Sequence, residues 1–95
     1  MPAAQYYIVY IVPAKGVSPD LIEQKMDLGL DWYRVRNSLW VLYTTAGADK
    51  WYSRLEPLVK RTGRLFICKL DMTRRQGWME REFWNWLKGR ESQRR

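Results

Sequence analysis

Hydrophobic and aromatic positions along this chain cluster in four short runs that predict β-strands. Residues 6–12 form an unbroken run of β-branched and aromatic side chains, which is typical of a strand buried on both faces. Residues 31–36 alternate in polarity and lead through a two-residue Asn-Ser turn into the apolar run 39–44, a pattern that predicts a hairpin. Residues 64–70 form the fourth run.

Helical periodicity fills the two gaps between these strands. Ser18-Pro19 supplies an N-cap and a first-turn proline for a helix that Gly29 closes. The apolar positions of this helix are Leu21, Ile22, Met26 and Leu28. Residues 48–61 predict a second helix, in which Pro57 removes a backbone hydrogen bond and so predicts a kink or a break.

The predicted order is strand, helix, strand, strand, helix, strand. This order predicts an α+β chain with the ferredoxin-like βαββαβ arrangement, a four-stranded antiparallel sheet with both helices on one face. Of strands 6–12 and 64–70, one is expected to be central and the other to lie at an edge. We therefore expect a ferredoxin-like core over residues 1–72, and over residues 73–95 a C-terminal helix and basic tail that packs on this core or on a dimer partner.

The second face of the predicted sheet needs a cover. Strands 6–12 and 39–44 offer apolar or aromatic side chains on both faces, and soluble proteins rarely expose large apolar patches. Three covers are open at this stage: the C-terminal segment, a second copy of the chain, or nucleic-acid bases stacked on the aromatic rings.

The C-terminal segment has helical periodicity with one apolar stripe. At about 100° per residue, the stripe consists of Met79, Phe83, Trp86 and Leu87, with Trp78 at its edge. Trp84 lies on the other side of the helix, together with Glu80, Arg81 and Lys88. The pattern predicts that the stripe packs on the sheet and that Trp84 faces a partner.

Composition excludes several kinds of chemistry. The chain has no His and one Cys, so zinc sites of the Cys/His type, internal disulfides and Ser-His or Cys-His nucleophile pairs are excluded. Cys68 alternates with Phe66 and Leu70, so we expect it to be a small core residue. The start of the chain lacks the basic region of a signal peptide, and its apolar run is too short to span a membrane. These features predict a cytoplasmic protein with no membrane partner.

Positive charge is concentrated in the second half of the chain. Residues 1–49 carry four Lys or Arg against five Asp or Glu, whereas residues 50–95 carry thirteen against five. Such asymmetry favours a polyanionic partner, although net charge also serves solubility.

Four stretches of the chain resemble a known family. The segments IVYIVPAKG, LDWYRVRNSLWVLYTT, RLEPLVKRTGRLFICKL and QGWMEREFWNWLK are similar to small ferredoxin-fold proteins described as SinR-like, which are themselves similar to the second CRISPR-associated adaptation protein and to VapD. The points of closest similarity are Trp32, the Ser38/Trp40 pair, Pro57 and Gly77-Trp78.

This resemblance implies a homodimer whose open sheet faces meet, with the segment after the last strand lying across the partner. The implied interface residues are Tyr10, Trp40, Trp78 and Trp86. Nuclease members of the family bind a divalent metal through an Asp that follows a Tyr at the end of the first strand. Here Ile11 follows Tyr10, so the metal-binding carboxylate is missing. We therefore expect no metal, no cofactor and no enzymatic activity.

The remaining signal is basic residues interleaved with aromatic ones. Trp32, Arg34 and Arg36 share one face of the predicted strand 31–36, an arrangement that suits base stacking with phosphate contact. The alternative is a solvent-facing strand whose Arg stems cover Trp32. The predicted nucleic-acid contacts are Arg34, Arg36, Arg74, Arg75 and Arg81, with Trp32 and Trp84 as stacking groups.

The sequence therefore predicts a non-catalytic homodimer that binds DNA or RNA. One alternative is a protein-interaction module, a regulator or inhibitor, that uses the same aromatic and basic surface. Another is a residual metal-dependent nuclease in which Asp31 and Asp71 meet across a dimer.

Overall fold

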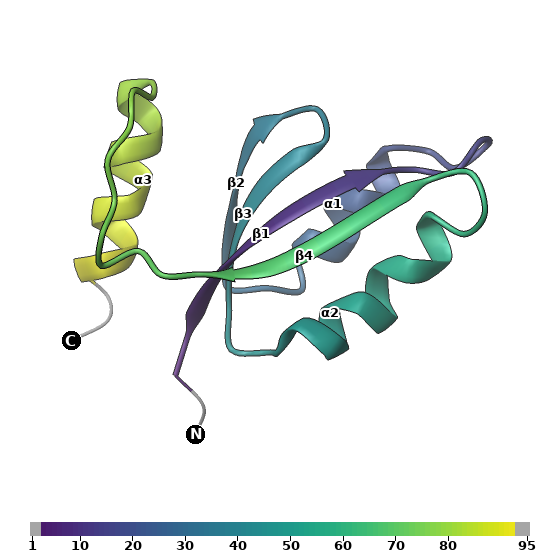
Figure 1. Cartoon of the computed structure of the whole chain (residues 1–95), viewed down its shortest axis with the longest axis horizontal. Helices are drawn as coiled ribbons and strands as arrows, with labels where there is room; N and C mark the ends of the chain where they lie inside the picture. Colours follow the sequence, from purple (N-terminus) through teal and green to yellow (C-terminus); the bar gives the residue numbers. More distant parts are fainter. Residues whose placement is uncertain (1–2, 93–95) are drawn as a thin grey trace.

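The computed structural model describes residues 3–92 and shows an α+β chain built on one four-stranded antiparallel sheet (Figure 1). The strands are β1 (Gln5–Val12), β2 (Asp31–Arg36), β3 (Leu39–Thr44) and β4 (Arg64–Leu70). Their order in the sheet is β2-β3-β1-β4, so β1 is central while β2 and β4 form the edges. The prediction of an α+β chain with a four-stranded antiparallel sheet is confirmed, and one of the first and last strands is central while the other lies at an edge, as expected.

Helix α1 (Asp20–Met26) is shorter than the sequence predicts. Pro19 takes the N-cap position, and the Ser18 hydroxyl accepts a hydrogen bond from the Asp20 amide at 3.3 Å. Helix α1 buries Ile22 and Met26. The other two predicted core positions are exposed: Leu21 because only one side of this short helix faces the sheet, and Leu28 because it lies in the turn after the helix has ended.

Helix α2 (Ala48–Leu55) ends where Pro57 requires it to end. A single 3₁₀ turn, η1 (Glu56–Leu58), replaces the rest of the predicted helix, so the predicted break is confirmed. The chain then passes against β1 at Gly63, where an added Cβ would overlap the carbonyl oxygen of Val12 and the backbone of Val59. Glycine is therefore required at this close approach.

The main core lies between the sheet and the helices α1 and α2. Trp40, Leu42 and Trp51 are completely buried there. The other members of this buried cluster are Tyr7, Val9, Ile11, Ile22, Met26, Leu55, Leu58 and Val59. The indole N–H of Trp51 donates a 3.0 Å hydrogen bond to the hydroxyl of Thr44, which is itself buried.

Helix α3 (Arg81–Ser92) covers part of the opposite face. It stands at one end of the sheet, away from α1 and α2 (Figure 1). Phe83 and Leu87 of α3 form a second buried cluster with Tyr6, Val41 and Tyr43 of the sheet. The C-terminal segment therefore packs on its own core, one of the two arrangements that the sequence leaves open. Residues 93–95 of the predicted basic tail lie outside the described residues.

Candidate nucleic-acid interface

A β-bulge in β2 separates two arginines that were expected on one face. Arg34 pairs with Trp40, but Arg36 pairs with Leu39, so the register shifts between them. Trp40 belongs to the face that carries α1 and α2, whereas Leu39 alternates with it and points to the other face. The prediction that Trp32, Arg34 and Arg36 share a face is therefore wrong for Arg36, because the extra residue of a bulge reverses the alternation.

Trp32 and Arg34 both pack on the rim of the main core. The indole N–H of Trp32 donates a 2.8 Å hydrogen bond to Oδ1 of Asp27, and its ring meets that of Trp40 edge-on at 4.8 Å. The guanidinium carbon of Arg34 lies 4.8 Å from the ring centroid of Trp40, and its Nη2 donates to the carbonyl oxygen of Asn37 at 2.8 Å. Through these contacts Trp32 and Arg34 stabilise the packing on the face of the sheet that carries α1.

Trp40 does not lie at the expected dimer interface, because its side chain points to the face of the sheet that carries α1 and α2. Its side chain is completely buried between the sheet and the helices, beneath Arg34. An interface on the opposite face of the sheet does not reach it. The alternation of β3 points Val41 and Tyr43, rather than Trp40, to that face.

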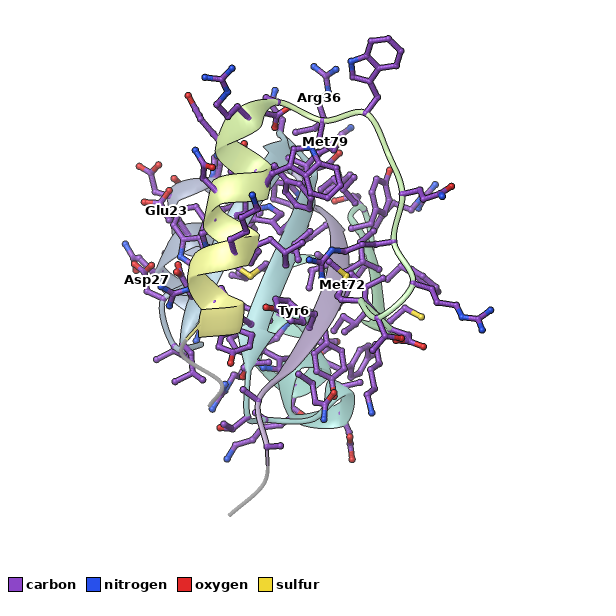
Figure 2. All side chains as sticks on the ribbon, turned by 90° about the vertical axis from the view of Figure 1, so that its left-hand side faces the viewer. Tyr6, Glu23, Asp27, Arg36, Met72 and Met79 are labelled. Carbon is purple, nitrogen blue, oxygen red and sulfur yellow. The ribbon has the colours of Figure 1, made fainter. Side chains whose placement is uncertain are left out.

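Arg36 instead lies near the start of the α3 segment. In Figure 2, Arg36 and Met79 are both at the upper end of α3. The hydroxyl of Tyr33 donates a 2.7 Å hydrogen bond to Oε1 of Glu80. This bond, a backbone hydrogen bond and the charge of Arg36 lower the pKa of Glu80, while burial and the same carboxylate raise the pKa of Tyr33 to about 12. Arg81 follows directly and is exposed.

The tryptophans around α3 differ in exposure from the predicted arrangement. Trp86 packs on its own sheet, with ring centroids 6.2 Å from Tyr6 and 5.8 Å from Tyr33. Trp84 is half-buried and meets Phe83 edge-on at 5.3 Å, so it does not project freely towards a partner as expected. Trp78, which lies before α3, is the fully exposed one. Because α3 begins only at Arg81, helical geometry does not apply to Trp78.

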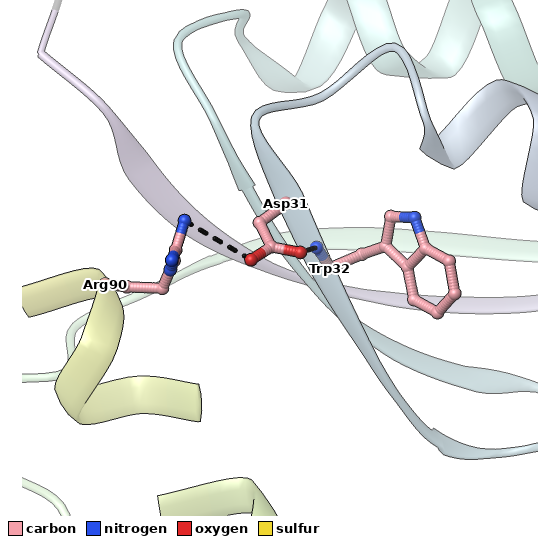
Figure 3. Close-up of polar contacts among 3 residues, drawn as sticks. All are labelled: Asp31, Trp32 and Arg90. Carbon is pink, nitrogen blue, oxygen red and sulfur yellow. Dashed lines mark hydrogen bonds and ion pairs between the residues drawn. The ribbon is translucent and has the colours of Figure 1, made fainter. Parts of the chain in front are cut away.

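Asp31 and Asp71, the candidate metal ligands, are both engaged in local structure. Figure 3 shows Asp31 between Arg90, whose Nη1 lies 3.3 Å from its Oδ2, and the backbone amide of Trp32, which donates to its Oδ1 at 2.7 Å. Asp71 accepts hydrogen bonds from the amide and the hydroxyl of Thr73, and these two bonds lower its pKa. Within one chain two strands separate Asp31 from Asp71. Residues 3–92 contain no group of three His, Cys, Asp or Glu placed to hold a metal ion.

Helix α3 leaves one half of its sheet face uncovered. We call this surface the open half-face, and its side chains are Ile8, Tyr10, Val12, Leu39, Phe66 and Cys68. Tyr10 is 40% exposed and Phe66 61% exposed, although they are direct partners across β1 and β4. Cys68 is also exposed, so the prediction that it is a core residue is wrong. The expectation that residues 6–12 are buried on both faces is wrong at Tyr10, because α3 covers only the half of this sheet face that contains Tyr6 and Tyr43.

Exposed cations follow the β4 edge of the sheet. This cationic edge consists of Arg64 and Lys69 on β4 and Arg74 and Arg75 in the loop after it. Beside it lies a hollow of about 800 Å³. The hollow is lined by Gln5, Tyr6, Lys69, Leu70, Asp71, Met72, Thr73 and Arg75.

The structure thus brings the predicted Arg74 and Arg75 next to a basic edge strand and places Arg36 at the far side of the open half-face. Trp32 and Arg34 lie on the opposite face of the sheet from the open half-face. Sequence reasoning missed Phe66 and Lys69, because it left open which of strands 6–12 and 64–70 lies at the edge. An edge strand lacks a neighbour on one side, so its side chains are the ones to expect at the surface.

Comparisons with protein-family models, with curated proteins and with solved structures found no match for this chain, so the family resemblance stays a prediction. No helix among residues 3–92 is both long and apolar enough to cross a membrane.

Proposed function

We propose that this chain is a small, non-catalytic nucleic-acid-binding protein of ferredoxin-like fold. One observation carries the proposal: exposed cations follow β4 and the loop after it, namely Arg64, Lys69, Arg74 and Arg75, and the same strand presents the exposed ring of Phe66 next to Tyr10. Cations combined with accessible aromatic rings suit a partner that has both phosphates and bases. The order β2-β3-β1-β4, with every pair antiparallel, supports the finer assignment of the fold.

Binding through this edge is expected to be led by phosphates. The only carboxylate within β4 and the five residues after it is that of Asp71, which already accepts hydrogen bonds from the amide and the hydroxyl of Thr73. Lys and Arg side chains that neutralise phosphates release counterions from the nucleic acid, and this release makes affinity fall as salt rises. Contacts of this kind position the protein without reading sequence, so we expect weak sequence specificity.

The absence of catalysis is part of the proposal. Asp31 is paired with Arg90, and Asp71 closes the turn at Thr73, so both carboxylates have structural partners. Oligonucleotide incubated with the protein and Mg²⁺ or Mn²⁺ is expected to stay intact. Cleavage that disappears in an Asp31→Asn or Asp71→Asn variant would establish the nuclease alternative instead.

The test is a fluorescence-anisotropy titration of labelled oligonucleotides, single- and double-stranded, at several salt concentrations. We expect the logarithm of the association constant to fall linearly with the logarithm of salt concentration. Replacing Arg74 by Ala is expected to reduce the slope by about 0.7 for a single strand, the contribution of one phosphate contact. Lys50→Ala is the matched control, because Lys50 is an exposed cation on α2, away from the cationic edge. Absent binding at low salt, or affinity independent of salt, removes the proposal.

A protein-interaction module is the second candidate, and Trp78 favours it. An indole that is 100% exposed beside Arg74 and Arg75 has the composition of a protein hot spot. The homodimer implied by the family resemblance also stays a prediction. It competes for the open half-face, and sedimentation equilibrium at micromolar concentration distinguishes a dimer from a monomer.

A further inference from the structure

We propose that the open half-face binds single-stranded nucleic acid by stacking unpaired bases on Tyr10 and Phe66. This inference rests on the proposed nucleic-acid binding and specifies where the bases lie and which form of nucleic acid is bound. It assigns base stacking to neither Trp32 nor Trp84, which pack within the chain.

The stacking rings stand in one row across the sheet. The register pairs Phe66 with Tyr10, Tyr10 with Leu39, and Leu39 with Arg36, so these four side chains follow one another from β4 to β2. Neighbouring strands are roughly 4.8 Å apart, which gives the row a span of about 14 Å. A sheet surface of this width with two aromatic rings accommodates about two or three stacked bases.

Exposure shows that these rings are accessible rather than structural. Phe66 is 61% exposed and Tyr10 40% exposed, and neither belongs to the two buried clusters of the chain. Tyr6 and Tyr43 lie on the same face but are buried beneath α3. Helix α3 therefore buries the side chains of Tyr6 and Tyr43 but does not reach the row that contains Tyr10 and Phe66.

Charge around the row matches a polyanion. Arg36 stands at its β2 end, and Arg64 lies on β4 two residues before Phe66, on the same face. The open half-face and these two rim positions contain no Asp or Glu. Glu80, the carboxylate near Arg36, already accepts the hydrogen bond of Tyr33. A strand crossing the row thus meets guanidinium groups at both ends, and the cationic edge continues beyond Phe66.

Base stacking requires a single strand. In a duplex each base is already stacked on its neighbours and presents only its edges in the grooves, whereas an unpaired base offers its whole face to an aromatic ring. Tyr10 and Phe66 carry no charge and no amide group with which to read base edges. The rings therefore favour single-stranded nucleic acid, while phosphate contacts alone would accept either form.

A second copy of the chain fits this surface less well. In a two-fold contact the same patch meets itself, which would bring the cationic Arg36 and Arg64 side chains of both copies together. The open half-face has six side chains, whereas a stable interface takes about 20–30 residues from each partner. Size and charge both favour a nucleic-acid strand over a dimer.

The experiment measures the affinity of the full chain for a 5′-labelled oligothymidylate of about ten nucleotides. Phe66→Leu and Tyr10→Leu are each expected to weaken binding about tenfold, the loss that corresponds to one stacked base. The salt slope is expected to stay unchanged, because no phosphate contact is removed. Tyr52→Leu is the matched control: this ring is 56% exposed on α2, and its loss is expected to leave affinity within twofold.

Conservative variants and a melting curve keep the test decisive. Tyr10→Phe retains the ring and is expected to bind like the parent, and thermal melting identifies any variant that has lost its fold. Three results overturn the inference while leaving salt-dependent binding intact: losses below twofold for both Leu variants, equal losses with duplex DNA, or a parent dimer that Phe66→Leu converts to monomer. If the parent chain binds neither single strand nor duplex at low salt, the proposed function itself fails.

Discussion

Thr44 illustrates how much one hydroxyl contributes inside the main core. Its side-chain oxygen accepts two hydrogen bonds, from the Trp51 indole at 3.0 Å and from the Ala46 amide at 3.1 Å. Trp51 is completely buried, so its N–H has no water to bond if the hydroxyl is lost. A buried donor without a partner costs stability, whereas the shape of the core changes little.

We therefore expect Thr44→Val to lower the free energy of unfolding by about 1–3 kcal/mol. Valine keeps the volume and the β-branched shape of threonine, so the loss reports the hydrogen bonds rather than packing. Urea denaturation followed by tryptophan fluorescence measures it. Thr45→Val serves as the control, because Thr45 is exposed and its substitution is expected to change stability by less than about 0.5 kcal/mol. Equal effects for the two variants would contradict the assignment.

Helix α3 depends on polar contacts at both of its ends. The Tyr33–Glu80 hydrogen bond holds the segment before its first turn, and the Asp31–Arg90 ion pair holds its last turns. Between them Phe83 and Leu87 supply the buried surface. The half of the sheet face that α3 covers is thus set by contacts that are far apart in sequence.

Tyr33→Phe tests the first of these contacts through its pH dependence. The folded-state pKa of Glu80 is lowered below its ordinary 4.5, so the stability it contributes is present above pH 4.5 and is lost as pH falls through the folded-state value. The pKa of Tyr33 is raised from 10.0 to about 12, so its contribution is present below pH 10 and is lost as pH rises towards 12. The melting temperature of the parent is therefore expected to exceed that of Tyr33→Phe on a plateau between these limits.

Thermal melts of both proteins from pH 3 to pH 11 measure this difference. Tyr52→Phe is the control, since it removes an exposed phenol from α2 and is expected to show no such plateau. A difference between parent and Tyr33→Phe that does not change with pH would show that the hydroxyl acts without Glu80.

Local signals in the sequence predict most of the elements. The turn at Asn37-Ser38 and the break at Pro57 follow from the residues themselves, and both are confirmed. The bulge before Arg36 was not predictable, because a bulge is a property of two paired strands and not of one. The exposure of Trp78 was missed for a related reason: helical periodicity was extended past the residue at which α3 begins.

At the scale of the whole molecule, two asymmetries coincide. Charge is concentrated in the second half of the sequence, and the structure arranges part of it along the β4 edge. Packing is also asymmetric, since α1 and α2 bury a larger cluster on one sheet face than α3 buries on the other. The partial cover leaves Tyr10 and Phe66 accessible beside the cationic edge, a juxtaposition that neither asymmetry produces alone.

Cys68 reports directly on this juxtaposition, because it is the chain's single cysteine and lies on the open half-face between Phe66 and Leu70 along β4. The measurement is the rate at which iodoacetamide, an uncharged reagent, alkylates the unmodified protein with and without saturating oligothymidylate. We predict that the bound strand slows alkylation about tenfold and that salt high enough to displace it restores the rate. An unchanged alkylation rate, with anisotropy showing the oligonucleotide bound, would contradict the claim that this surface receives the strand.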